Sequence, residues 1–356
     1  MTTVHLQFGL YVPQPNITVG SREIVRSVAG ALAPLPEHAV DPAFEVSKSV
    51  LCAADAAGFD IILFAERHLG PDLEAWIMAS AIGAATRRIR SMVAVHPGLW
   101  HPTLIAKMAA SLDRISSGRM AINLVTGWNE VEHRMFGGSA MPQSDDRYVR
   151  AEEYIEILRG LWKTSPFSYA GRFYQLDEVE LRLRPATPSP PDIFTASRSE
   201  RGLDMVAKHA DWWFLDFPKT VQNAQEMMES LKRSIDDMDR RAARHNRKVR
   251  YAFNPFVAFG PSEEAAMEDI LKVLMSTDPD ADGRKIRSRV TPALKAGCVG
   301  PADKIREQMM KFRDLGIELL LLKFVPTLAE VARIRDEIIE PLRNERSIPA
   351  SLAAAG

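Results

Sequence analysis

Three short stretches of the sequence carry residue types that could hold a planar, phosphorylated molecule. The first runs from Asn123 to Trp128, and its Asn123 and Thr126 offer hydrogen-bond donors and acceptors to the edge of a ring. Gly127 would let such a ring approach the backbone closely. The same stretch is also typical of a strand end with capping residues before a helix, so its composition leaves both interpretations open.

The other two stretches favour a phosphate group. Arg147 and Tyr148 supply a cation and a hydroxyl donor, although Asp145 could make this segment a capped helix start and no more. Ser197 and Ser199 lie where an apolar run gives way to a helical pattern, and free amides at a helix N-terminus suit a phosphate. Ser199 could also simply cap that helix. Taken together, the three stretches predict a cradle for a phosphorylated planar cofactor.

A fourth group of polar residues follows two other apolar runs. Glu66 and His68 end one run, and His96 and His101 follow the next. At the mouth of a barrel these side chains could orient a substrate or move a proton, whereas a lone histidine there is more commonly a polar wall residue. None of them has the spacing of a metal site, and no GxSxG motif is present, so neither a metal nor a serine nucleophile is predicted.

The elements that must position these residues are eight short apolar runs alternating with amphipathic helical segments. This alternation predicts an α/β fold, a (β/α)₈ TIM barrel with insertion loops at its C-terminal face. A doubly wound open sheet is the alternative, but the glycine-rich turn it would place after the first strand is missing. The expected strands are Leu6–Val12, Ile61–Ala65, Ser91–Val95, Met120–Val125, Ile193–Ala196, Trp212–Asp216, Tyr251–Phe259 and Leu319–Val325.

Three long connections depart from regular barrel spacing. Thr18–His38 follows the first strand, Trp162–Pro191 resembles an inserted hairpin, and Ser276–Val299 has the composition of a lid. Gly58 and Gly316 are expected just past the ends of helices. No linker divides the chain, so residues 1–345 are expected to form one domain, with 346–356 as a C-terminal tail.

Composition narrows the cellular setting. The net charge of −1 over 356 residues predicts neither a nucleic acid nor a membrane partner. No apolar run reaches the roughly 20 residues of a membrane span, and the N-terminus lacks a signal-peptide pattern. Cys52 and Cys298 are expected to be free thiols, although a disulfide between them is the alternative. We therefore expect a cytoplasmic protein.

The run from Lys107 to Met120, continued by Asn123–Trp128, resembles the bacterial luciferase-like flavin monooxygenases. Within that family the similarity favours the branch of alkanesulfonate, dimethyl sulfone and pyrimidine monooxygenases, and it spans Phe8 to Leu342. The resemblance implies FMN, used as FMNH2 supplied by a separate NAD(P)H-dependent flavin reductase, with O2 as co-substrate and a small organic molecule as substrate. It also implies a homodimer or homotetramer.

The resemblance further implies roles for individual residues. Asn123 would bond the flavin edge, and Glu132 matches a flavin-contacting glutamate of the pyrimidine branch. Arg147 and Tyr148 would meet the ribityl phosphate, and Ser199 or Ser197 would complete that site. Glu66, His68, His96 and Asn254 remain the candidates for catalysis.

One departure from the family pattern concerns the substrate. The alkanesulfonate enzymes place an arginine and a histidine where this chain has Asn254 and Phe256. Loss of that fixed cation favours a sulfone, another organosulfur compound or an amide-containing heterocycle over a sulfonate, unless loop residues supply the charge. The loop candidates are Arg198, Lys295 and 284–289. A deazaflavin-dependent oxidoreductase, a non-catalytic flavin-binding protein and a non-flavin barrel enzyme remain the alternatives.

Overall fold

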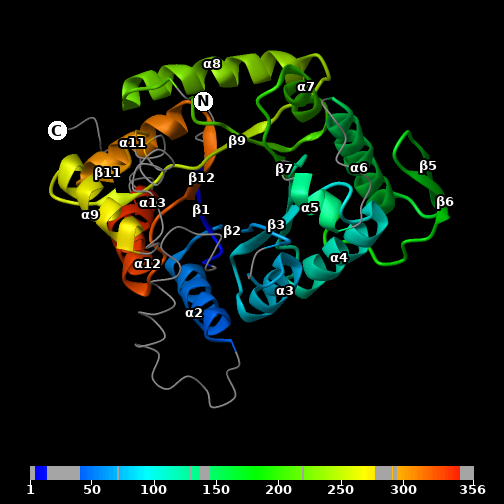
Figure 1. Ribbon diagram of the computed structural model, residues 1–356, viewed down its shortest axis with the longest axis horizontal. Helices are drawn as coiled ribbons and strands as arrows, with labels where there is room; N and C mark the ends of the chain where they lie inside the picture. Colours follow the sequence, from blue (N-terminus) through cyan, green and yellow to red (C-terminus); the bar gives the residue numbers. More distant parts are fainter. Residues whose placement is uncertain are drawn as a thin grey trace. The chain divides into compact units, whose positions relative to one another are not determined.

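The computed structural model describes residues 5–13, 41–69, 72–127, 130–136, 145–218, 220–276, 291 and 295–344. Eight parallel strands close into a barrel in the order β1-β12-β9-β8-β7-β4-β3-β2, with helices between consecutive strands (Figure 1). The prediction of a TIM barrel is confirmed, and the doubly wound open sheet is excluded. The barrel strands are β1 (Gln7–Tyr11), β2 (Ile61–Phe64), β3 (Arg90–Val95), β4 (Met120–Leu124), β7 (Asp192–Thr195), β8 (Trp212–Phe214), β9 (Arg250–Phe253) and β12 (Ile317–Leu322).

The chain divides into two compact units. The first comprises residues 1–60, 217–230 and 254–356, and the second comprises 61–216 and 231–253. The elements outside the barrel sheet are α2 (Pro42–Ala57), α3 (Ala75–Ala85), α4 (Pro102–Ile115), α5 (Glu130–Met135), α6 (Asp146–Lys163), β5 (Phe167–Ala170), β6 (Gln175–Val179), α7 (Glu200–His209), α8 (Ala224–Ala243), β10 (Ala258–Phe259), α9 (Glu263–Ser276), β11 (Val299–Gly300), α11 (Ala302–Asp314), α12 (Leu328–Ile334), the π-helical η1 (Arg335–Ile339) and α13 (Glu340–Asn344).

Local sequence explains where these elements begin and end. Every residue of β2 is buried, as expected of a parallel strand that is covered on both faces. Asp41 caps α2 by accepting hydrogen bonds from the amides of Ala43 and Phe44, and Gly58 ends it at a φ of 87°. Gly316 likewise adopts a positive φ after α11, so both predicted helix ends are confirmed.

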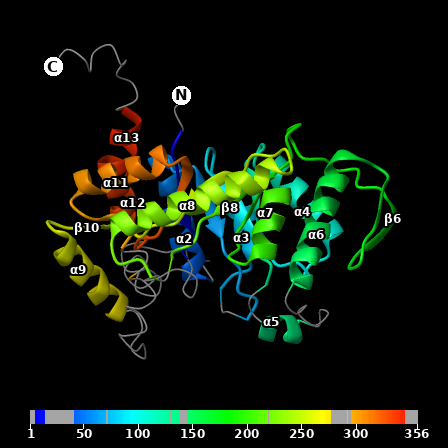
Figure 2. The same cartoon turned by 90° about the horizontal axis from the view of Figure 1, so that it is seen from above.

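The insertion between α6 and β7 is a two-stranded antiparallel hairpin of β5 and β6, as predicted, and it lies on the outer side of α6 in both ribbon views (Figures 1 and 2). The single strand expected over Tyr251–Phe259 is wrong beyond Phe253. The chain leaves the barrel there, and β10 pairs with β11 in a separate two-stranded sheet. Asp145 makes no side-chain cap at the start of α6.

Several expectations fall on residues outside the described ranges: Trp128, all of Thr18–His38, most of Ser276–Val299, and the tail 346–356. A single domain over residues 1–345 stays a prediction. Cys52 and Cys298 are free, as expected. Within the described part of the chain, none of the helices combines the length and apolarity needed to cross a membrane.

Candidate functional site

Most of the candidate residues lie in the second unit, at the C-terminal ends of neighbouring strands. The register pairs Ala94 of β3 with Asn123 of β4, and Leu124 of β4 with Thr195 of β7. Because parallel strands end at the same edge, the segments that follow β2, β3, β4 and β7 converge on one end of the sheet. Glu66, His96, Thr126 and Ser197 belong to these four segments.

The hydroxyl of Tyr148 is the centre of one cluster in this unit. Its oxygen lies 2.9 Å from Nη2 of Arg147, 2.8 Å from Oγ of Ser199 and 3.5 Å from Oγ of Ser197, and all three groups can donate to it. Burial acts to raise the pKa of Tyr148, but the hydrogen bonds from Ser197, Ser199 and Arg147 outweigh it and lower that pKa. With donors on its oxygen, the phenol hydrogen is left to point toward a further acceptor.

The N-terminus of α7 adjoins this cluster. Ser199 caps the helix by accepting from the amide of Gly202, so the capping interpretation and the predicted cluster with Tyr148 are both found in the structure. Gly202 permits the close approach: a Cβ there would lie 1.8 Å from Oγ of Ser197 and 2.6 Å from Cε1 of Tyr148. Any other residue would push Ser197 away from the phenol.

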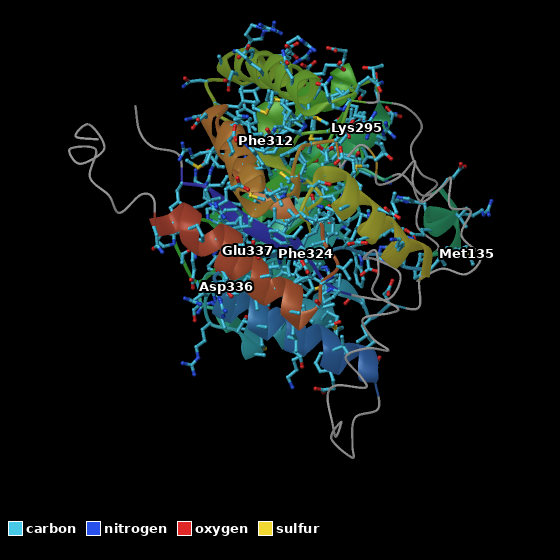
Figure 3. All side chains as sticks on the ribbon, turned by 90° about the vertical axis from the view of Figure 1, so that its left-hand side faces the viewer. Met135, Lys295, Phe312, Phe324, Asp336 and Glu337 are labelled. Atoms are coloured by element: carbon cyan, nitrogen blue, oxygen red, sulfur yellow. The ribbon has the colours of Figure 1, made fainter. Side chains whose placement is uncertain are left out.

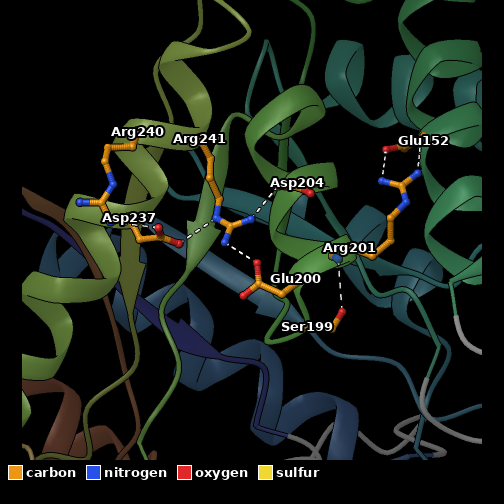
Figure 4. A network of polar contacts seen from close by, with 9 residues as sticks. Glu152, Ser199, Glu200, Arg201, Asp204, Asp237, Arg240 and Arg241 are labelled. Carbon is orange, nitrogen blue, oxygen red and sulfur yellow. Dashed lines mark hydrogen bonds and ion pairs between the residues drawn. The ribbon is translucent and has the colours of Figure 1, made fainter.

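Two arginines fix α7 between its neighbouring helices (Figure 4). Arg201 makes two 2.7 Å bonds to the carboxylate of Glu152 on α6. Arg241 of α8 pairs with Glu200, with Asp204 at 2.6 Å and with Asp237 at 2.7 Å. Such paired guanidinium forks hold the helix start rigidly, which is what a preorganised anion site requires.

The residues predicted to contact a flavin ring lie at the end of β4 and on α5. Asn123 and Thr126 are half-buried, and Gly127 adopts a φ of 96°, a conformation that favours glycine. Glu132 is only 4% exposed. It lies on α5, which buries Glu132 and His133 but exposes Val131 and Met135, and Phe136 just after the helix is also exposed; Figure 3 labels Met135 beside this helix. This inversion of the usual pattern turns the polar groups of α5 inward and leaves its apolar side chains exposed.

Glu66, His68 and His96 form a second cluster. Oε1 of Glu66 lies 3.8 Å from Nδ1 of His68, and Nε2 of His68 lies 3.3 Å from Nδ1 of His96. The other carboxylate oxygen of Glu66 accepts from the Ala75 amide at the start of α3. The structure therefore brings together three of the four residues predicted for catalysis.

Burial sets the charge state of this cluster. It raises the pKa of Glu66 to about 7, assisted by the charges of Glu74 and Glu132 and opposed by hydrogen bonds from the Ala75 and Arg67 amides. It lowers the pKa of His96 to about 4, with His68 and His133 acting in the same direction. Burial also lowers the pKa of His68. Near neutral pH the proton of the cluster therefore resides on the carboxyl group more than on the imidazoles.

Sequence reasoning missed three buried polar residues beside this cluster: His133 on α5, Arg150 on α6, and Tyr174 between the hairpin strands. They belong to no recognisable motif, and only their location in the fold brings them to the site. His101, by contrast, caps α4 by accepting from the Thr103 amide, and its ring packs against Tyr174. Among the described residues, no group of three or more histidines, cysteines or carboxylates could hold a metal ion.

Asn254, the fourth residue predicted for catalysis, lies in the first unit directly after β9. Its amide donates to the hydroxyl of Tyr11 at 3.1 Å. Nζ of Lys323, just past β12, lies 5.7 Å from the centre of the Tyr11 ring and 5.8 Å from that of Phe217. Sequence reasoning missed this ammonium group, which supplies a cation close to Tyr11.

Phe256 is a buried core residue. It is 1% exposed and packs with residues of β10, α9 and β11. Its backbone pairs with Lys323 through an isolated bridge. The difference from the alkanesulfonate enzymes expected at Phe256 therefore falls on a packing residue.

Comparison with known proteins identifies the family of the chain. The luciferase-like monooxygenase family model matches residues 36–319. The chain is 29% identical to an FMNH2-dependent dimethylsulfone monooxygenase of Pseudomonas fluorescens over 346 residues, covering 89% of this chain and 92% of that protein. It is 31% identical to the pyrimidine monooxygenase RutA of Allorhizobium ampelinum over 219 residues, covering 59% of this chain and 56% of the relative.

Solved structures share the fold. A riboflavin lyase with modified FMN and riboflavin superposes with a TM-score of 0.74 at 17% identity, covering 98% of this chain and 93% of the lyase. The family match spans most of the sequence, as does the similarity to the sulfone monooxygenase. The chain therefore belongs to the luciferase-like monooxygenase family.

Proposed function

We propose that the protein is a two-component, FMNH2-dependent monooxygenase that oxygenates a small organic substrate with O2. Support comes from the family and from relatives whose names specify FMNH2 as the reductant. A separate NAD(P)H-dependent flavin reductase supplies FMNH2. We further propose that the enzyme works in the reducing cytoplasm, which suits its two free thiols, and assembles as a homodimer or homotetramer.

The observation that carries the cofactor assignment is the convergence of donors on Tyr148. Arg147, Ser197 and Ser199 surround its hydroxyl at the N-terminus of α7, and Nε of Arg147 is buried without a hydrogen-bond partner among the described residues. A set of donors with a cation and a helix N-terminus fits the phosphate of FMN. On this proposal Asn123, Thr126 and Glu132 bind the flavin ring.

When bound, FMNH2 supplies the two electrons that activate O2. The protein's own residues bind the cofactor, exclude water and manage a proton. Glu66, with a pKa raised to about 7 by burial, holds that proton at its carboxyl group, and His68 and His96 form a short path for it. Asn123 and Gly127 orient the ring from the end of β4.

Donor groups in the first unit suit a substrate with neutral acceptor oxygens. The amide of Asn254 donates to Tyr11, which leaves the Tyr11 hydroxyl hydrogen free to bond a substrate oxygen. Sulfonyl and cyclic amide oxygens are acceptors of this kind. We therefore propose a sulfone, another organosulfur compound or an amide-containing heterocycle as substrate.

Two measurements test the proposal in sequence. Anaerobic titration of the full-length protein with FMNH2, and separately with a reduced deazaflavin, should show tight binding of FMNH2 alone. A panel of sulfones, sulfonates, pyrimidines and small heterocycles is then incubated with protein, flavin reductase and O2, and each product is analysed by mass. A gain of one oxygen atom or a cleaved carbon–sulfur bond supports the assignment. Binding of FMNH2 without substrate-dependent O2 consumption over the whole panel would instead favour a flavin-binding protein.

A further inference from the structure

The side chain of Arg150 on α6 is buried without a counter-ion. The residue is 2% exposed, and within the described part of the chain none of its three guanidinium nitrogens has a hydrogen-bond partner. The two carboxylates that follow it on the helix bond other groups: Glu152 pairs with Arg201, and Glu153 accepts from the backbone amides of residues 172–174. A buried cation that lacks a partner destabilises a fold, so a group that neutralises it would stabilise the protein.

The loop after β3 approaches the guanidinium group of Arg150 at Gly98. A Cβ built on Gly98 would lie 2.2 Å from Nη1, 2.5 Å from Cζ and 2.8 Å from Nη2 of Arg150. These three distances place that position above the face of the guanidinium group, whose N–H bonds lie in its plane. Gly98 has a φ of 97°, a conformation that also favours glycine. The loop therefore covers the face of the cation and leaves its N–H edge to another group.

Tyr174, in the hairpin loop between β5 and β6, packs against the same loop after β3. Its ring centre lies 5.8 Å from that of His101 and 5.8 Å from that of Tyr154, whose hydroxyl donates to the carbonyl of Trp100 at 3.1 Å. Tyr154 lies one helical turn after Arg150, so both side chains leave the same face of α6. The hydroxyl of Tyr174 is buried and, among the described residues, has no hydrogen-bond partner.

Electrostatic effects connect the Tyr174 hydroxyl with the guanidinium group and the Gly98 backbone. Burial raises the pKa of Tyr174 to about 12, opposed by the charge of Arg150 and by the Gly98 amide and assisted by Glu153. Burial lowers the pKa of Arg150, and Tyr174 acts in the opposite direction. The guanidinium group, the phenol and the Gly98 amide can each donate a hydrogen bond, and one of them carries a positive charge. Together they are a donor set that suits an anion.

We propose that Arg150, the Tyr174 hydroxyl and the Gly98 amide form a buried site for a small inorganic monoanion of the size of chloride. One such ion neutralises the single cation, and the burial of both side chains limits its size. A water molecule could accept hydrogen bonds from the same donors, but it would leave the charge uncompensated. When bound, the anion joins α6, the loop after β3 and the hairpin loop, and so stabilises the fold.

This site is distinct from the proposed phosphate site at Tyr148. Tyr148 lies two residues before Arg150 on α6, and side chains with that spacing do not face each other on a helix. The inference goes beyond the proposed function and does not rest on it.

The test is the thermal unfolding of the flavin-free full-length protein in potassium chloride and potassium gluconate at equal ionic strength. Gluconate is too large for a site closed to solvent, so it serves as the reference anion. Raising chloride from about 1 mM to about 100 mM at the expense of gluconate should raise the melting temperature of wild type by roughly 2–4 °C. In Arg150→Met the melting temperature should not depend on which of the two anions is present. An equal response in the variant, or none in wild type, would overturn the proposal.

Matched variants separate this site from general effects of salt. Arg182→Met removes a guanidinium group whose side chain is 87% exposed and should keep the full chloride response. Tyr148→Phe alters the proposed phosphate site and should keep that response too. Tyr174→Phe keeps the ring but removes one donor, so the chloride concentration that gives the same shift should rise roughly tenfold. This last variant carries the test if Arg150→Met fails to fold.

Bromide locates the site directly. Crystals of the flavin-free protein grown in bromide should show an anomalous peak within hydrogen-bond distance of the Arg150 guanidinium group and the Tyr174 hydroxyl. An ordered water molecule there, without bromide, would overturn the proposal. So would an Arg150→Met variant that loses the same stability in both salts, because Arg150 would then have a packing role. A protein that binds no FMNH2 but shows the chloride response would refute the proposed function and leave this inference standing.

Discussion

Nε2 of His68 lies 3.3 Å from Nδ1 of His96, and the two rings meet edge to face with their centres 5.3 Å apart. At this separation one imidazole donates and the other accepts, so the pair can carry a single proton between them. Glu66 approaches the opposite nitrogen of His68. His68 therefore lies between the buried carboxyl group of Glu66 and His96 at the end of β3.

Replacing Glu66 by glutamine tests whether this carboxyl group supplies a proton. Since its pKa is raised to about 7, the protonated form is present below that pH, and the wild-type rate should fall as the pH rises through 7. Glu66→Gln should lower kcat by about 10²-fold or more and remove this alkaline limb, while FMNH2 affinity stays the same. His101→Gln, which alters a helix cap outside the cluster, should retain the profile. An unaltered profile in Glu66→Gln would exclude this role.

Tyr148→Phe tests the phosphate site. Loss of a hydrogen bond to a charged group costs about 1.5–3 kcal/mol, so the Kd for FMNH2 should rise roughly 10- to 100-fold. Reduced riboflavin has no phosphate and serves as the matched ligand, because its affinity should be nearly the same for wild type and variant. Anaerobic fluorescence titration measures both constants. Equal weakening of the two ligands would place the Tyr148 hydroxyl away from the phosphate.

Lys323→Met tests whether the ammonium group beside Tyr11 contributes to substrate binding. An ammonium group attracts the partial negative charge of an acceptor oxygen, so the variant should show a KM roughly tenfold higher for whichever substrate the panel identifies. kcat and the Kd for FMNH2 should change little, because the predicted flavin residues are elsewhere in the chain. Lys304→Met on α11, an exposed lysine paired with Glu307, provides the control. A fall in kcat without a change in KM would argue against a binding role.

The barrel could be predicted from sequence because its strands depend on local apolar runs. β2 and β3 match their expected ranges within one residue, since both are buried on both faces and bounded by polar segments. The error after Phe253 arose because Phe256 and Val257 continue the apolar pattern. Their apolar character serves the core around β10 and α9, and nothing local distinguishes that core from the barrel.

Only those residues of the candidate site that lie in recognisable sequence segments could be predicted. Arg147, Tyr148, Ser197 and Ser199 lie in such segments, and the structure brings their polar groups together. Arg150 and His133 lie in no such segment. An arginine or histidine on a helix is usually exposed, so the sequence gives no sign that these two side chains are buried. Arg150 approaches Gly98, and the charge of His133 acts on His96; tertiary packing alone brings these positions together.

The dependence of stability on pH should distinguish the buried carboxyl from the buried imidazole. His96 has a folded-state pKa lowered to about 4 from 6.5, so the unfolded chain binds more protons in this window and stability is lost as the pH falls from 6.5 to 4. Glu66 has the opposite sign, because its pKa is raised from 4.5 to about 7, and its contribution declines as the pH rises across that window. His96→Gln should therefore lose less stability than wild type on acidification, and Glu66→Gln should gain relative to wild type between pH 4.5 and 7. Thermal unfolding of the three flavin-free proteins at intervals of half a pH unit measures both slopes, and parallel curves would show that neither group changes its proton affinity on folding.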